Sequence, residues 1–63
     1  MNTLKIDEQI VKMQHITTIY LLEEKIGIKE KTPFKDLEKK SNKALFSYVE
    51  QLVEAYNKKI KEQ

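Results

Sequence analysis

His15 is the only histidine of this 63-residue chain, and its imidazole is the side chain best suited to acid–base chemistry near neutral pH. It could serve as a general base, a phosphate acceptor or a pH switch. A carboxylate that oriented it from the same helix would stand three or four residues away. Those positions hold Val11, Lys12, Thr18 and Ile19. The sequence therefore favours a histidine at the edge of a helix interface over a catalytic one.

Other catalytic patterns are missing from the sequence. The chain has no cysteine and a single glycine, so it offers neither a thiol nucleophile nor a glycine-rich phosphate loop. The neighbouring acids Glu23 and Glu24 point to different sides of a helix and cannot act on one atom. No metal-ligand spacing surrounds His15. We expect no enzyme activity, no cofactor and no metal site.

The lysines gather in the middle of the chain. All twelve cationic residues are lysines, the formal net charge is +2, and residues 25–43 hold seven lysines against three acids. This basic pole could contact an anionic partner through Lys29, Lys31, Lys35, Lys39 and Lys43. Nucleic acid is one such partner, although the absence of arginine argues against reading of bases. A solvated, solubilising face explains the same lysines, and we favour it.

The aromatic residues occur at the spacing of a helix core. They could stack on bases or anchor a protein partner, but a core or interface position explains them better. The residues concerned are Tyr20, Phe34, Phe46, Tyr48 and Tyr56.

The sequence predicts one all-α domain over residues 1–63. A first helix is expected over about 4–26 and should end at Gly27, which suits a left-handed cap. A connector over 27–32 leads to Thr32 as N-cap and Pro33 as first helical residue. A second helix over about 33–62 would then complete an antiparallel hairpin. A break at Ser41-Asn42 is the alternative, because both residues favour caps, but we favour the continuous helix.

Each expected helix carries two apolar stripes, whereas a hairpin uses only one stripe per helix. The core stripes are Ile6, Ile10, Met13, Thr17 and Tyr20 in the first helix, and Phe34, Leu37, Ala44, Leu45, Tyr48, Leu52 and Ala55 in the second. The predicted interface residues on the second stripes are Leu4, Val11, Leu22, Phe46, Val49, Val53, Tyr56 and Ile60. A chain of this size buries only about 60% of its unfolded surface, so oligomerisation would stabilise it. We expect a homodimer that forms a four-helix bundle.

These features predict a small regulatory or adaptor protein that acts by helix-mediated protein–protein interaction. The alternative is a nucleic-acid-binding regulator that uses the basic pole. We expect the partner to be a second copy of the chain, another protein, or both. No apolar run is long enough for a membrane span, and the charged start of the chain at residues 1–8 does not resemble a signal peptide, so a cytoplasmic location is expected.

Overall fold

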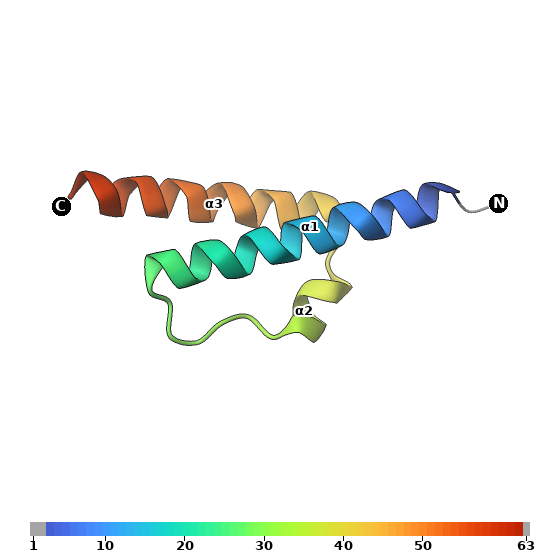
Figure 1. Ribbon diagram of the computed structural model, residues 1–63, viewed down its shortest axis with the longest axis horizontal. Coiled ribbons are helices and arrows are strands. Elements are labelled where there is room, and N and C mark those ends of the chain that lie inside the picture. Colours follow the sequence, from blue (N-terminus) through green and yellow to red (C-terminus); the bar gives the residue numbers. More distant parts are fainter. Residues whose placement is uncertain (1–2, 63) are drawn as a thin grey trace.

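The computed structural model describes residues 3–62, with side chains from residue 6 onward. It contains three helices: α1 (Thr3–Ile26), α2 (Phe34–Lys39) and α3 (Asn42–Lys61). Figure 1 shows the two long helices, α1 and α3, packed side by side, with the short α2 beside them. The predicted all-α class and the predicted first helix are confirmed. None of the described helices is both long enough and apolar enough to cross a membrane.

Gly27 ends α1 as the sequence predicted. Its φ is 93°, a value that only glycine adopts easily. Its amide donates to the carbonyls of Glu23 and Glu24 at 3.0 and 3.2 Å, and the amide of Ile28 donates to Glu23 at 3.0 Å. This pattern is a Schellman cap, which satisfies carbonyls that the helix end would leave without partners.

The expected continuous second helix is wrong, and the alternative break is present. α2 ends at Lys39, and both Lys40 and Ser41 have extended backbones. The Ser41 hydroxyl then accepts a hydrogen bond from the Ala44 amide at 3.1 Å and caps α3. Helical periodicity runs through both segments, but a serine that satisfies a free amide favours a new helix start over an unbroken one.

Thr32 is also not the N-cap that we expected. α2 begins at Phe34, Pro33 occupies the cap position, and no side chain caps the helix. A residue that precedes proline is restricted to extended conformations, which places Thr32 in the connector. Its hydroxyl donates instead to the side chain of Glu23.

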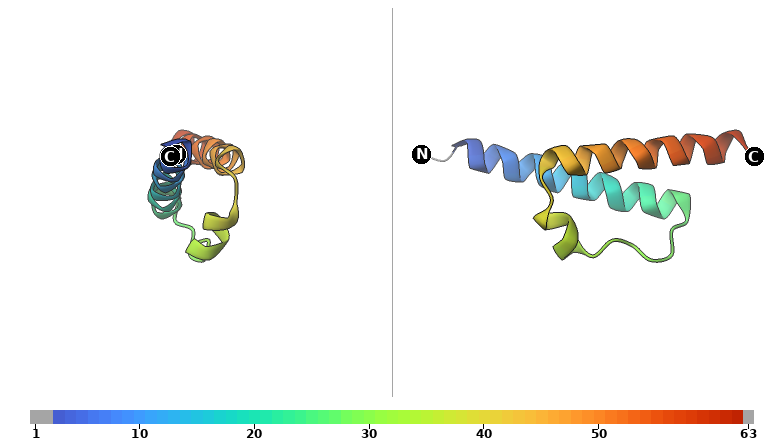
Figure 2. Two further views of the ribbon diagram at one scale, coloured as in Figure 1. Left: turned by 90° about the vertical axis from the view of Figure 1, so that its right-hand side faces the viewer. Right: turned by 180° about the vertical axis from the view of Figure 1, so that it is seen from behind.

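α1 and α3 run in the same direction, so the expected antiparallel orientation is wrong (Figures 1 and 2). The side chain of Asn42, at the start of α3, donates to the carbonyl of Glu8 at 3.1 Å. Near the other end, Lys59 donates to the carbonyl of Ile26 at 2.5 Å. The extended connector and α2 together span about 30 Å, which is about the length of α3. This return path brings the chain back along α1 before α3 begins, and that makes the two long helices parallel.

The core is small and lies where the three helices meet. Its members, which are at most 5% exposed, are Ile16, Ile19, Leu37, Leu45 and Leu52. The predicted core face of the C-terminal half is confirmed at Leu37, Leu45 and Leu52, whereas Phe34 is 42% exposed. The predicted core face of α1 is wrong at Ile6, Ile10 and Met13, which are about half exposed. Its last member, Tyr20, is half-buried and packs against the core. Apolar residues lie all round α1, so spacing alone could not show which side meets α3.

Candidate protein-interaction surface

Figure 2 shows α2 and the connector on one side of the α1–α3 pair, and we call the opposite side, which no described segment covers, the outer face. The rings of His15 on α1 and Phe46 on α3 have centroids 5.9 Å apart and join the two helices at this face. Helix geometry places Val11 and Leu22 on the same side of α1 as His15. It likewise places Val53 and Ile60 on the side of α3 that carries Phe46. The second apolar stripes of the two helices therefore form one surface.

The predicted interface residues remain accessible in the single chain. Phe46 is 51% exposed, Val53 is 41%, Ile60 is 49% and Val11 is 38%. The remaining members whose side chains are described are half-buried at the edge of the core: Leu22, Val49 and Tyr56. The side chain of Leu4 lies outside the described part. Such an exposed apolar surface makes the outer face a candidate site for protein interaction.

A second apolar strip lies along the back of α1. Ile6, Ile10 and Met13, which the sequence placed in the core, line a shallow hollow with Gln9 and Thr17. This hollow is formed by α1 alone, so it adds apolar surface without a second wall. Leu21, which belongs to neither predicted stripe, is a further apolar residue on the surface of α1 and is 59% exposed.

The opposite side of the pair is held by polar contacts around Glu23, which is fully buried. Its Oε2 accepts hydrogen bonds from the hydroxyls of Tyr48 at 2.7 Å and Thr32 at 3.0 Å. The Tyr20 hydroxyl donates to the carbonyl of Thr32 at 3.0 Å. Burial, and then the hydrogen bond to Glu23, raise the pKa of Tyr48 above its ordinary value. We call these four residues the Glu23 cluster; it ties α1, the connector and α3 together.

The Glu23 cluster was not predicted from the sequence, where Glu23 stands out only as one of two adjacent acids. Charged residues on helices are normally solvated, so a glutamate in α1 is expected at the surface. Its spacing in the sequence does not mark it as buried. The only available signal was the heptad step from Ile16 to Glu23, which places the acid on the same side of α1 as a core residue.

Two lysines cap the ends of helices elsewhere in the chain. Lys12 donates to the carbonyl of Glu38 in the last turn of α2 at 2.7 Å. Lys59 reaches the carbonyl of Ile26 in the last turn of α1. Carbonyls at helix C-termini carry partial negative charge, so a cation is favourable at both places. These lysines are therefore engaged within the fold.

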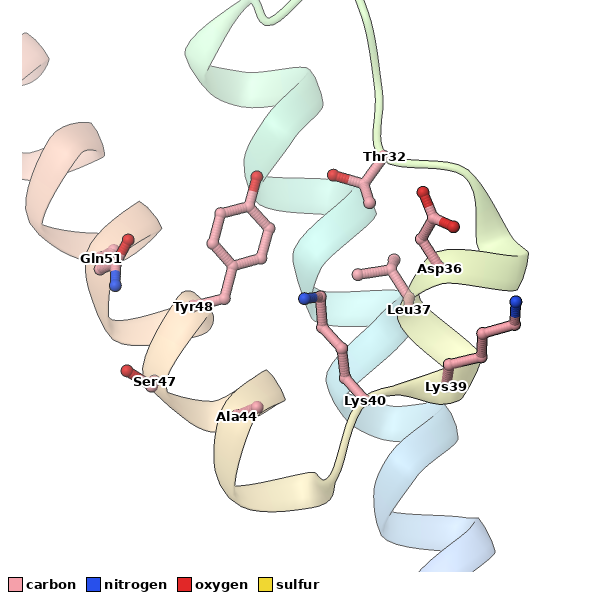
Figure 3. Close-up of a pocket in the computed structure, with 9 residues that line it drawn as sticks. All are labelled: Thr32, Asp36, Leu37, Lys39, Lys40, Ala44, Ser47, Tyr48 and Gln51. Carbon is pink, nitrogen blue, oxygen red and sulfur yellow. The ribbon is translucent and has the colours of Figure 1, made fainter.

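An open groove of about 700 Å³ separates α2 from α3 (Figure 3). Buried Leu37 and the ring of Tyr48 line it, and so do Thr32 and Asp36 at one end and Lys39 and Lys40 at the other. The hydroxyls of Tyr48 and Thr32 already donate to Glu23. The groove thus combines an apolar floor with one acid and two cations.

The basic pole is present but divided. Lys35 and Lys39 lie on α2, Lys43 lies on α3, and Lys29 and Lys31 lie in the connector. The break at Lys40 and Ser41 removes the single continuous helix on which Lys35, Lys39 and Lys43 were expected to form one stripe. Lys31 is paired with Glu24 at 2.8 Å, and this hydrogen bond and charge lower the pKa of Glu24.

The described contact of the His15 ring is with the ring of Phe46, and not with an acid that could orient the imidazole for acid–base chemistry. Within the described residues, no three side chains of histidine, cysteine, aspartate or glutamate come together as metal ligands would. The fold and surface together define a small three-helix protein built on a parallel pair of long helices, with an apolar outer face. No known protein family, curated protein or solved structure matches this chain.

Proposed function

We propose that this is a small non-enzymatic regulatory or adaptor protein that acts by helix-mediated protein–protein interaction through its outer face. One observation supports this most strongly: nine large apolar side chains are exposed among the described residues, whereas five are buried. Contiguous apolar patches on the surface of a soluble protein commonly mark protein–protein interaction sites. Four of the nine, Val11, Phe46, Val53 and Ile60, lie on the outer face, and a second layer of helices there would remove them from water.

A second copy of the chain is the partner that we propose first. The exposed stripes of α1 and α3 would pack on those of the copy and complete a four-helix bundle, which is a common arrangement for chains with this pattern. A cytoplasmic location, expected from the sequence, stays a prediction.

The experiment is light scattering behind a sizing column at micromolar concentration, which should give twice the chain mass. Val53→Lys should give a monomer, because Val53 lies in the middle of the Phe46–Ile60 stripe and a lysine there would be buried against the copy without a partner charge. Val53 is 41% exposed in the single chain, so the fold itself tolerates the change. Glu50→Lys, on the same helix and exposed, is the matched control and should leave the dimer intact. A wild-type chain that remains monomeric overturns self-association.

The basic pole supports the second candidate, nucleic-acid binding. Three phosphate contacts would give a salt slope of about −2 to −3 on duplex DNA. Replacing Lys35, Lys39 and Lys43 together by Gln should then abolish binding and keep the fold. Because the helix break separates Lys43 from the other two, we expect only weak binding that vanishes near physiological salt. Sequence-selective, salt-resistant binding in a gel-shift assay would put this candidate first.

A further inference from the structure

We propose that α1 pairs with α1 of a second copy in antiparallel orientation, and that a self-complementary stripe on α1 specifies this orientation. This inference rests on the proposed function, because it names the arrangement of the self-association proposed there. The stripe consists of Asp7, Val11, Gln14, Thr18, Leu21 and Lys25.

The stripe is continuous along α1. Its members follow one another at steps of four, three, four, three and four residues, which keeps them on one side of a helix. All six side chains are exposed. Among the described contacts, none of them bonds to the connector, α2 or α3; the Thr18 hydroxyl donates to the carbonyl of Gln14 on its own helix at 2.9 Å. The whole stripe is therefore free for a partner.

When two copies of the stripe pack in antiparallel orientation, each residue faces a complementary residue of the copy. In an isologous dimer, if residue i meets residue j, then j also meets i. With the two-fold axis on the stripe side of α1, level with position 16, Asp7 meets Lys25 of the copy and Val11 meets Leu21. At the centre, Gln14 meets Thr18, whose hydroxyl oxygen can still accept a hydrogen bond from an amide. Two ion pairs at the ends thus enclose two apolar pairs and two polar pairs.

If the two α1 helices packed in parallel, residues of like charge would face each other at both ends of the stripe. Asp7 would meet Asp7 and Lys25 would meet Lys25, and like charges across an interface select against that pairing. The helix dipoles favour the same choice, because antiparallel helices place each positive end beside a negative one. Charge and dipole thus both favour the antiparallel dimer.

The decisive experiment is a charge exchange in the full chain, read as the dissociation constant of the dimer. Asp7→Lys alone and Lys25→Asp alone should each weaken the dimer roughly tenfold, since each replaces two attractive pairs by two repulsive ones. The double variant Asp7→Lys/Lys25→Asp should return to within about twofold of wild type, because the pairs are restored with reversed polarity. Lys29→Asp makes the same charge change in the connector and should have little effect.

Cross-linking supplies a second readout, because the chain has no cysteine of its own. In the antiparallel dimer, residue 7 lies beside residue 25 of the copy and about 27 Å from residue 7 of the copy. A mixture of Asp7→Cys and Lys25→Cys chains should therefore form a mixed disulfide, and neither variant alone should cross-link with itself.

The outcomes separate this inference from the proposed function. A wild-type dimer whose Asp7→Cys variant cross-links with itself, or whose charge exchange restores nothing, overturns the antiparallel arrangement and leaves self-association in place. A wild-type chain that sizes as a monomer overturns self-association itself. A wild-type dimer, a double variant that regains wild-type affinity and a mixed disulfide would together support self-association and its antiparallel arrangement.

Discussion

The two sides of the α1–α3 pair are built from different interactions. On the inner side, Glu23, Tyr48, Thr32 and Tyr20 form hydrogen bonds that tie α1, the connector and α3 together. On the outer face, Phe46, Val53 and their neighbours expose apolar surface that no segment of the described chain covers. Directional bonds therefore position the return path on one side, whereas the other side is the apolar face for which we propose a partner. Substitutions on either side of the pair, and in the return path, test this division.

The largest effect is expected in the core. Leu45 on α3 is fully buried, and Leu45→Ala should reduce the free energy of unfolding by about 2–5 kcal/mol, because it removes apolar contacts and leaves a cavity. Leu21→Ala, at a residue 59% exposed, should change the stability of the single chain by less than about 0.5 kcal/mol. Urea denaturation at high dilution measures both. Equal losses would contradict the assignment of Leu45 to the core and of Leu21 to the exposed surface.

A smaller effect is expected from the Glu23 cluster. Tyr48→Phe removes a hydroxyl that donates to Glu23 at 2.7 Å and leaves a buried carboxylate less satisfied. We expect a loss of about 1–3 kcal/mol in the free energy of unfolding. The matched control is Tyr56→Phe, which removes a hydroxyl from the half-buried side chain of Tyr56 on the outer side of α3. If the two substitutions reduce the free energy of unfolding equally, the Glu23 cluster does not stabilise the inner side.

Gly27 tests the start of the return path. Gly27→Val should reduce the free energy of unfolding by about 1–2 kcal/mol, because a β-branched residue is strained at a φ of 93°. Crowding is not the cause, since an added Cβ would meet only the Nζ of Lys59, at 3.5 Å. Gly27→Asn should lose less, because asparagine tolerates positive φ better. Thermal melts of the three proteins would show this order, and a valine variant as stable as wild type would contradict it.

The smallest expected effect is a loss of stability in alkali. The pKa of Tyr48 is raised in the folded chain above its ordinary 10.0, so the folded state holds this proton more tightly than the unfolded state does. Its contribution is complete below pH 10 and is lost as the pH rises through the higher folded value. The melting temperature should therefore fall above about pH 10. Tyr48→Phe should show a shallower fall, and the same slope in both proteins would contradict the assignment.

Local signals in the sequence determined where the helices end. Gly27 terminates α1 because no other residue type adopts its backbone conformation so readily. Ser41 carries its own capping oxygen, which is why the break before α3 was visible as an alternative. The buried face of α3 was also predicted, at Leu45 and Leu52, because its apolar residues lie on one side of the helix.

Tertiary structure decided the direction of α3, the buried side of α1 and the burial of Glu23. A helix terminator determines where α1 ends, but it does not determine the length of the segment before the next long helix. That length makes α1 and α3 parallel. Apolar residues surround α1, so contact with α3 and α2 selects Ile16 and Ile19 for the core and leaves Ile6 and Ile10 exposed. Glu23 is buried because two hydroxyls from distant segments converge on its carboxylate. Such convergence of segments far apart along the chain leaves no trace in local spacing, and only the folded chain reveals it.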